Sequence, residues 1–116
     1  VVYDQTGTPT YAGDLAKALI SISRLYINEN IWHEGIYHFT NRGVCSWYDF
    51  TMHIFELTNI KANVKPLLTS EYPTKATRTT YSVLNTSKIS STFNIEIPYW
   101  TDSLREMLEN FSKLNP

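Results

Sequence analysis

Arg78 is the residue whose type and surroundings best fit a binding chemistry. It lies in a long irregular stretch, residues 72–82, where threonine and tyrosine side chains surround it. A guanidinium can donate two parallel hydrogen bonds to a phosphate while neighbouring hydroxyl groups bond to sugar oxygens. Long irregular stretches in compact domains are often functional. From spacing alone, however, a solvated loop arginine is the simpler interpretation.

Metal and cofactor chemistry find no support in the residue spacing. His33, His38 and His53 show no i, i+4 pairing, and a single cysteine cannot form a Cys-x-x-Cys pair, so we expect no metal site. Neither a Gly-x-Gly-x-x-Gly turn nor a Gly-Lys-Ser/Thr loop occurs, and these are the turns that hold nucleotide phosphates. We therefore expect this chain to bind no cofactor by itself.

Catalytic chemistry is equally unsupported. Enzymes that transfer hydride to a sugar ketone commonly use a tyrosine followed four residues later by a lysine. Tyr72 has Lys75 at a spacing of three, and Pro73 between them is incompatible with a helix interior. Cys45 could be a nucleophile only beside a base in a polarised setting; a half-buried apolar role is simpler. We expect no catalytic residue here.

Composition indicates one globular domain over residues 1–116, with 42% hydrophobic and 18% charged residues. A net charge of −1 argues against broad electrostatic binding to nucleic acid or to an anionic membrane. The apolar runs are too short to span a membrane, and the first residues lack the basic region of a signal peptide. Cytoplasm is the default expectation.

Apolar residues at helical spacing predict the elements that would position Arg78. The first helix is expected over about residues 11–28, with Thr10 as its cap. A second helix is expected to follow Ser46, whose side chain forms a capping box with Asp49, and to end near residue 59.

Two further helices and several strands complete the expected fold. A short helix follows a cap at Asn85 or Thr86, and the last helix follows a cap at Thr101. Alternating or β-branched residues predict strands over residues 1–5, 35–41 and 63–70. The sequence thus predicts an α/β fold with about four helices packed on a few short strands.

Four motifs, in order along the chain, resemble the C-terminal portion of the dTDP-4-dehydrorhamnose reductases, which are extended short-chain dehydrogenases/reductases. The motifs are DQTGTPTYAGDLA from residue 4, GIYHFTNRGVCSWYDF from residue 35, EYPTKATRTTYSVLNTSK from residue 71 and FNIEIPYWTDSLREML from residue 93. The resemblance covers nearly the whole chain. It implies a small C-terminal substrate domain from which the Rossmann half is missing, and a run that resembles a strand at the first residue fits a fragment of a longer enzyme.

The resemblance implies a function for the complete protein. It would reduce a dTDP-linked 4-keto sugar to dTDP-L-rhamnose with NADPH or NADH, and the missing N-terminal Rossmann domain would carry the cofactor turn and the Tyr-x-x-x-Lys pair. This chain alone would bind the dTDP-sugar and be inactive. The surface that meets the Rossmann half would be exposed, which favours a homo-oligomer.

The resemblance also assigns candidate substrate-binding residues. Arg78 would approach the diphosphate, although Thr79 stands where the family usually has a proline. Gln5 could face the sugar nucleotide, Thr10 would set the start of the first helix, and Tyr72 belongs to a Tyr-Pro-Thr motif. The same comparison places two tryptophans in the core, namely Trp47 and Trp100.

Two other functions remain open at this point. Regulatory subunits of methionine adenosyltransferase resemble these reductases but act through contacts with a partner protein. Related epimerases and dehydratases act on other nucleotide sugars, although that class usually carries an Arg-Asp pair in the turn that here begins with Asp4 and Gln5. An intact Tyr-x-x-x-Lys pair upstream would favour the reductase over the regulatory subunit.

Overall fold

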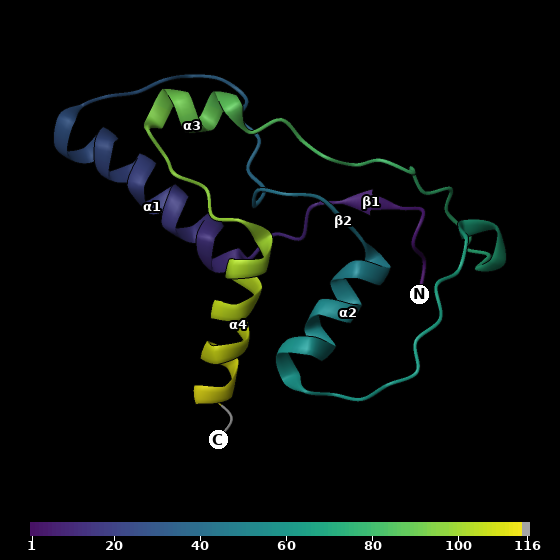
Figure 1. Cartoon of the computed structure of the whole chain (residues 1–116). Helices are drawn as coiled ribbons and strands as arrows, with labels where there is room; N and C mark the ends of the chain where they lie inside the picture. The colour runs from purple at the N-terminus through teal and green to yellow at the C-terminus, as the bar shows by residue number, and fades with distance from the viewer. Residues whose placement is uncertain (115–116) are drawn as a thin grey trace. The chain divides into compact units, whose positions relative to one another are not determined.

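The computed structural model describes residues 1–114, and its elements are shown in Figure 1. Backbone contacts divide the chain into two compact units. Unit 1 consists of Val1–Pro9 and Gly43–Val83, and unit 2 consists of Thr10–Arg42 and the described residues from Leu84 onward. Each unit therefore joins segments that are far apart in the sequence. That residues 1–116 form a single domain stays a prediction.

The N-terminal segment is the centre of unit 1. Strand β1 (Thr6–Gly7) pairs antiparallel with strand β2 (Cys45–Ser46), with Thr6 opposite Ser46 and Gly7 opposite Cys45. The expected strand over residues 1–5 is wrong in position, because within it only Val2 forms a bridge, to Leu67. The two paired residues of β1 lie just after it.

A third segment joins the same sheet through Thr6. The backbone N–H of Thr6 donates to the carbonyl of Thr80 at 2.8 Å, and the carbonyl of Thr6 accepts from the N–H of Ser82 at 2.9 Å. This parallel bridge centres on Tyr81. The end of the irregular stretch 72–82 is thereby fixed to the N-terminal segment.

Helix α2 (Trp47–Thr58) begins as the sequence predicts. The hydroxyl of Ser46 accepts from the backbone N–H of Asp49 at 3.0 Å, and the Asp49 carboxylate accepts from the Ser46 backbone N–H at 3.0 Å. These bonds form the capping box and satisfy N–H groups that have no partner within the helix. Hydrogen bonds from the side chain and backbone of Ser46 also lower the pKa of the Asp49 carboxyl.

The expected strand over residues 63–70 is wrong. Only Leu67 forms a bridge, and a short 3₁₀ helix, η1 (Thr69–Glu71), follows it. Pro66 has no N–H to donate to a ladder, which limits pairing beside it. Instead the N–H and hydroxyl of Thr69 donate to the Asp4 carboxylate at 3.0 and 2.7 Å, and these bonds lower the pKa of Asp4.

Unit 2 contains helices α1 (Ala12–Glu29), α3 (Ser87–Phe93) and α4 (Trp100–Leu114). The prediction of these three helices is confirmed. Helix α3 follows Thr86, one of its two expected caps, whereas the starts of α1 and α4 differ by one or two residues. Tyr11, rather than Thr10, is the N-cap of α1, and α4 begins one residue before Thr101. Among the described helices, none combines the length and apolar character that a membrane crossing requires.

Three helices end in the same way, on an asparagine in the left-handed conformation. Asn30, Asn59 and Asn94 follow α1, α2 and α3 with φ values of 53°, 55° and 50°. Asparagine is among the few residues other than glycine that adopt this conformation readily. The backbone N–H of each donates back to carbonyls of the last turn, so these asparagines stop the helices.

The strand expected over residues 35–41 does not form. A strand needs a neighbouring backbone for its N–H and C=O groups, and the described residues bring no strand to this segment. Pairing begins only at Arg42, which bridges to Tyr99. The β-branched and aromatic residues of 35–41 therefore form no ladder.

A buried carboxylate connects the elements of unit 2. Asp14 on α1 accepts hydrogen bonds from the amide of Asn41 at 2.8 Å and from the hydroxyl of Ser103 on α4 at 2.5 Å. All three residues are buried. Burial by itself raises the pKa of the Asp14 carboxyl, but the bonds from Ser103, Asn41 and Lys17 outweigh it and lower the pKa. This contribution to stability is present above the ordinary pKa of an aspartate and is lost as the pH falls through the lowered pKa.

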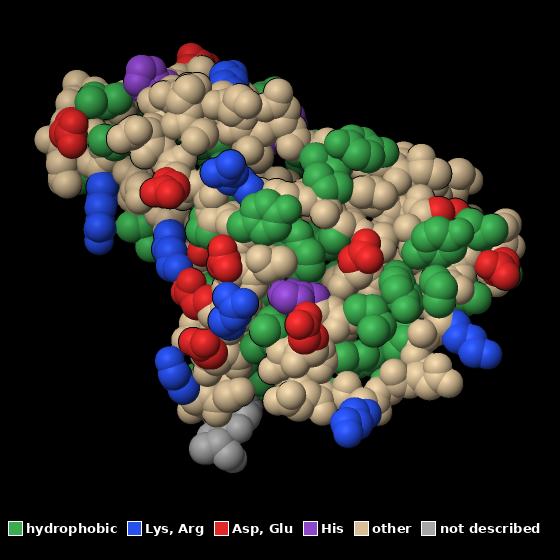
Figure 2. Space-filling model, in the orientation of Figure 1, with side chains coloured by type: hydrophobic (Ala, Val, Ile, Leu, Met, Phe, Trp, Pro, Cys, Tyr) green, Lys and Arg blue, Asp and Glu red, His purple; other side chains and the backbone are tan. Residues whose placement is uncertain are grey.

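Large apolar side chains are exposed in both units, as the green surface in Figure 2 illustrates. Those more than half exposed include Tyr72 and Tyr81 in unit 1 and Ile27, Trp32 and Ile36 in unit 2. Exposed apolar surface of this kind favours association. That the chain forms a homo-oligomer stays a prediction.

Replacing Ser103 tests the buried network. Ser103→Ala removes a hydrogen bond to a buried carboxylate, so we expect it to lower the free energy of unfolding by about 1.5–3 kcal/mol. Ser112→Ala is the matched control on the same helix, because Ser112 is exposed and its hydroxyl donates to the carbonyl of Leu108 within α4; its effect should stay within about 0.5 kcal/mol. Urea denaturation measures both, and equal effects would contradict the role of the network.

Candidate functional site

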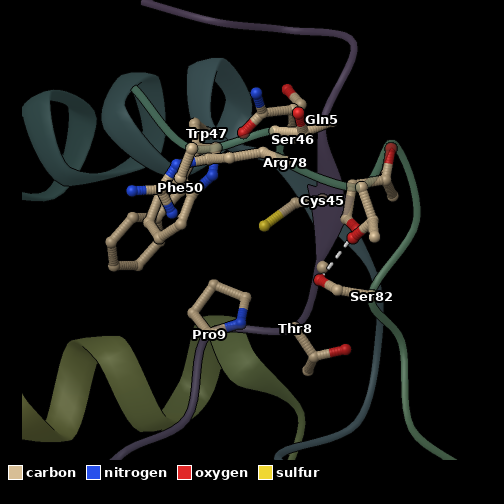
Figure 3. A pocket seen from close by; sticks show the side chains of 14 residues that line it. Gln5, Thr8, Pro9, Cys45, Ser46, Trp47, Phe50, Arg78 and Ser82 are labelled. Carbon is tan, nitrogen blue, oxygen red and sulfur yellow. Dashed lines mark hydrogen bonds between the residues drawn. The ribbon is translucent and has the colours of Figure 1, made fainter. Parts of the chain in front are cut away.

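Unit 1 contains a pocket of about 490 Å³, shown in Figure 3. Its volume lies in the range of small-molecule sites. Three segments line it: the N-terminal segment, the β2–α2 junction and the end of the irregular stretch. The lining residues are Gln5, Thr6, Gly7, Thr8, Pro9, Cys45, Ser46, Trp47, Phe50, Ala76, Thr77, Arg78, Thr79 and Ser82.

The pocket brings together two of the four candidate residues from the sequence. Gln5 and Arg78 both line it, although they are far apart in the chain. Tyr72 is exposed and is not among the lining residues, and Thr10 belongs to unit 2. The binding roles of all four residues stay predictions.

Close approach of two backbone segments shapes one wall. A Cβ at Gly7 would lie 2.8 Å from the hydroxyl oxygen of Ser82, which is closer than real Cβ contacts allow. Gly7 therefore permits β1 to lie against residues 80–82 because it lacks a side chain. Gln5 is held nearby, since its amide donates to the Thr69 hydroxyl at 3.1 Å.

The pocket lining is suited to an anion that carries hydroxyl groups. Arg78 is the one charged residue among the described residues that line it. A guanidinium remains protonated at all relevant pH values and donates in a planar fork. Hydroxyl groups also line the pocket, from Thr6, Thr8, Ser46, Thr77, Thr79 and Ser82. Those of Thr8, Ser46 and Ser82 already donate to Gly43, Asp49 and Thr6.

Cys45 lines this pocket as a neutral thiol. It is buried rather than half-buried, and burial first, with the negative charge of Asp49 second, raises the pKa of the thiol to about 11. The thiolate, which is the nucleophilic form, is therefore scarce at neutral pH. Cys45 contributes a small apolar surface, in line with its simpler interpretation.

Trp47 corrects the expectation that both Trp47 and Trp100 belong to the core. Trp100 is 7% exposed, but Trp47 is 53% exposed and lines the pocket. Trp47 is the first residue of α2, so its indole lies at the end of the helix rather than over its body. Its ring packs against Phe50, with centroids 6.4 Å apart and planes at 73°. The sequence contained one signal for this placement: Trp47 directly follows Ser46, the expected cap of the helix.

Metal binding has no comparable geometry. Among residues 1–114, no group of three or more His, Cys, Asp or Glu side chains is arranged to hold an ion.

The chain matches the model of the RmlD substrate binding domain over residues 1–113. It belongs to that family. Among curated relatives, it is 39% identical to the spore coat polysaccharide biosynthesis protein SpsK of Bacillus subtilis (strain 168), covering 97% of this chain and 37% of that protein. It is also 39% identical to the dTDP-4-dehydrorhamnose reductase of Aggregatibacter actinomycetemcomitans, covering 92% of this chain and 38% of that enzyme.

Solved structures of the family share this fold. The dTDP-4-dehydrorhamnose reductase (rfbD) of Bacillus anthracis str. Ames, in complex with NADP, superposes with a TM-score of 0.84 at 32% identity, over 95% of this chain and 37% of that one. The ortholog from Clostridium acetobutylicum gives a TM-score of 0.81 at 37% identity, over 97% and 38%. The α/β prediction is thereby confirmed, and the chain spans a little over a third of its relatives' length.

The thiol chemistry of Cys45 provides a test of the pocket wall. Because the pKa of Cys45 is raised to about 11, we expect slow alkylation by iodoacetamide at pH 7–9, rising as the pH approaches that value. The same chain in urea is the control, since the pKa of an unfolded cysteine is about 8.5 and its thiol reacts faster. Mass spectrometry of the Cys45 peptide measures both rates. Equal rates in the native and unfolded chain would contradict a buried, neutral thiol.

Proposed function

We propose that this chain is the substrate-binding part of an NADPH-dependent reductase that converts dTDP-4-dehydro-L-rhamnose to dTDP-L-rhamnose. The observation that carries the proposal is the pocket in unit 1, where Arg78 lies among hydroxyl side chains in a chain of the RmlD substrate-binding family. Relatives that match nearly the whole chain are named dTDP-4-dehydrorhamnose reductase.

Within this proposal Arg78 binds the diphosphate and Gln5 faces the sugar nucleotide. Both residues line one pocket, although they lie near opposite ends of the sequence of unit 1. This shared location supports the proposal. Hydroxyl groups of Thr8, Thr77 and Ser82 also line the pocket. Those of Thr8 and Ser82 donate to backbone carbonyls, so their oxygens are suited to accept from sugar hydroxyls. For Thr10 and Tyr72 the resemblance remains the support, since neither lines the pocket.

NADPH, when bound, supplies the hydride for such a reduction. The described residues do not offer a dinucleotide cradle, because their glycines are scattered and none opens a helix after a strand within a Gly-x-Gly-x-x-Gly turn. We assign the cofactor to the remaining part of the complete protein. Within the proposal, the residues of this chain bind the nucleotide sugar.

Another dTDP-linked ketone is the second candidate substrate. A relative from Streptomyces antibioticus, 35% identical over 107 residues, is named a probable dTDP-4,6-dihydroxy-2-methyloxan-3-one 4-ketoreductase. The dTDP part of the ligand is common to both candidates, so the role of Arg78 is the same in each.

Substitution of Arg78 tests the diphosphate contact. A hydrogen bond to a charged group contributes about 1.5–3 kcal/mol, so Arg78→Ala should weaken dTDP binding about ten- to a hundredfold, with NADPH affinity unchanged. Lys75→Ala is the matched control, because Lys75 is an exposed cation in the same stretch that does not line the pocket. Calorimetry on the complete protein measures both affinities. If the two variants bind dTDP equally well, Arg78 does not contact the diphosphate.

Turnover distinguishes binding from catalysis. We expect the chain alone to oxidise no NADPH in the presence of dTDP-4-dehydro-L-rhamnose, because it lacks a Tyr-x-x-x-Lys pair, while the complete protein does. Loss of NADPH absorbance and chromatography of the sugar product follow the reaction. Sustained reduction by the chain alone would place catalytic residues within it and overturn this part of the proposal.

A further inference from the structure

We propose that residues 73–79, which we call the strap, close over the pocket of unit 1 when an anionic ligand binds. The inference rests on the proposed function, because it takes dTDP, the part common to both candidate substrates, as the ligand. It adds a conformational step to binding, in which the ligand orders a segment that is open in the free protein.

The strap lacks the contacts that hold a segment in place. Among the residues that the structure describes, none of the strap residues takes part in a backbone–backbone hydrogen bond, and all of them are exposed. One bond lies within the strap, from the Thr74 hydroxyl to the carbonyl of Ala76 at 2.8 Å. The strap sequence, PTKATRT, has no large apolar side chain to pack into a core. A segment with exposed backbone and few buried contacts opens at little cost in free energy.

Both ends of the strap are fixed to the N-terminal segment. Before it, the N–H and hydroxyl of Thr69 donate to the Asp4 carboxylate at 3.0 and 2.7 Å. After it, the backbone of Thr6 bonds to Thr80 and Ser82. Because Asp4 and Thr6 are close neighbours in the chain, the strap is a short loop with fixed ends, and its movement is confined to the residues between them.

The strap also carries the charge of the pocket. Its last four residues, 76–79, line the pocket, and Arg78 is the one charged residue among the described residues that do so. Arg78 forms no ion pair or hydrogen bond with any of the described residues, and Figure 3 shows its side chain extending toward Phe50. A guanidinium without a protein partner is available for charge-assisted hydrogen bonds to an anion.

A bound diphosphate would supply the attachment that the strap lacks between its fixed ends. Ordering a segment of this length costs conformational entropy. Charge-assisted hydrogen bonds from Arg78 to the ligand offset that cost, because they are roughly twice as strong as bonds between neutral groups. Since these bonds exist only in the complex, the ligand shifts the strap from an open to a closed population.

Limited proteolysis of the complete protein by trypsin, followed by mass spectrometry, measures this shift. Lys75 is the informative cleavage site, because it belongs to the strap but does not line the pocket, so the ligand itself does not cover it. We expect fast cleavage after Lys75 in the free protein and about tenfold slower cleavage with saturating dTDP, as for a strap that is closed about nine-tenths of the time. Lys61 is the control site, since it is exposed in unit 1 outside the strap, and its cleavage should not change.

Hydrogen exchange provides a second measurement on the same samples. The amides of residues 74–79 should exchange fast in the free protein and slowly with dTDP. The amides of Thr6 and Ser82, which donate to Thr80 and Thr6, should be protected in both states.

Two arginine variants test whether the charge of the strap drives closure. With Arg78→Ala we expect saturating dTDP to leave cleavage after Lys75 as fast as in the free protein. Arg24→Ala removes an exposed arginine of unit 2 and should retain the tenfold protection. Unchanged cleavage after Lys61 in both variants verifies that they are folded.

The outcomes separate this inference from the proposed function. Should the wild type bind dTDP by calorimetry while cleavage after Lys75 stays the same, the strap proposal fails and the proposed function stands. Slow cleavage after Lys75 without ligand, equal slowing at Lys61 and Lys75, or full protection in Arg78→Ala would each overturn the strap proposal as well. Absence of dTDP binding in the wild type would reject the proposed function, and the strap proposal with it.

Discussion

The backbone pairing of Thr6 is the constraint on which the pocket depends. Thr6 lies opposite Ser46 in the two-stranded sheet, and its own N–H and C=O groups bond to Thr80 and Ser82. Residues near each of these three positions line the pocket, so a handful of main-chain hydrogen bonds converts three distant segments into one site. Such bonds are individually modest, but a buried donor or acceptor left unpaired is costly. Gly7 provides the close approach that this pairing needs.

The lining of this pocket combines one positive charge, an aromatic surface and several hydroxyl groups. Arg78 provides a positive charge without a carboxylate among the described lining residues, and Cys45 stays neutral because burial raises its pKa. A bound anion would meet the positive charge of Arg78, while the Asp49 carboxylate lies outside the lining but close enough to Cys45 to raise the pKa of its thiol. Trp47 supplies an apolar face that is exposed to water. A few polar groups beside an apolar surface are the usual composition of a small-molecule site.

Unit 2 is stabilised differently, by a buried polar network. The Asp14 carboxylate, the Asn41 amide and the Ser103 hydroxyl bond to one another where α1 and α4 meet residue 41. A carboxylate in this position is tolerated because donors surround it, and the net lowering of its pKa reflects their combined effect. Such a network specifies which faces of the helices pack together, since an alternative packing would leave a charge without partners.

Local signals in the sequence determined the helices, the irregular stretch and the family. Ser46 and Asp49 defined the start of α2 because a capping box involves only neighbouring residues, and Arg78 stood out by its hydroxyl-rich surroundings. The strands were predicted poorly: residues 35–41 have strand composition, but a strand forms only where another backbone is present to pair with it. Tertiary structure alone decided that Gln5 and Arg78 share a pocket and that Trp47 faces it, because those outcomes depend on hydrogen bonds between segments far apart in the chain.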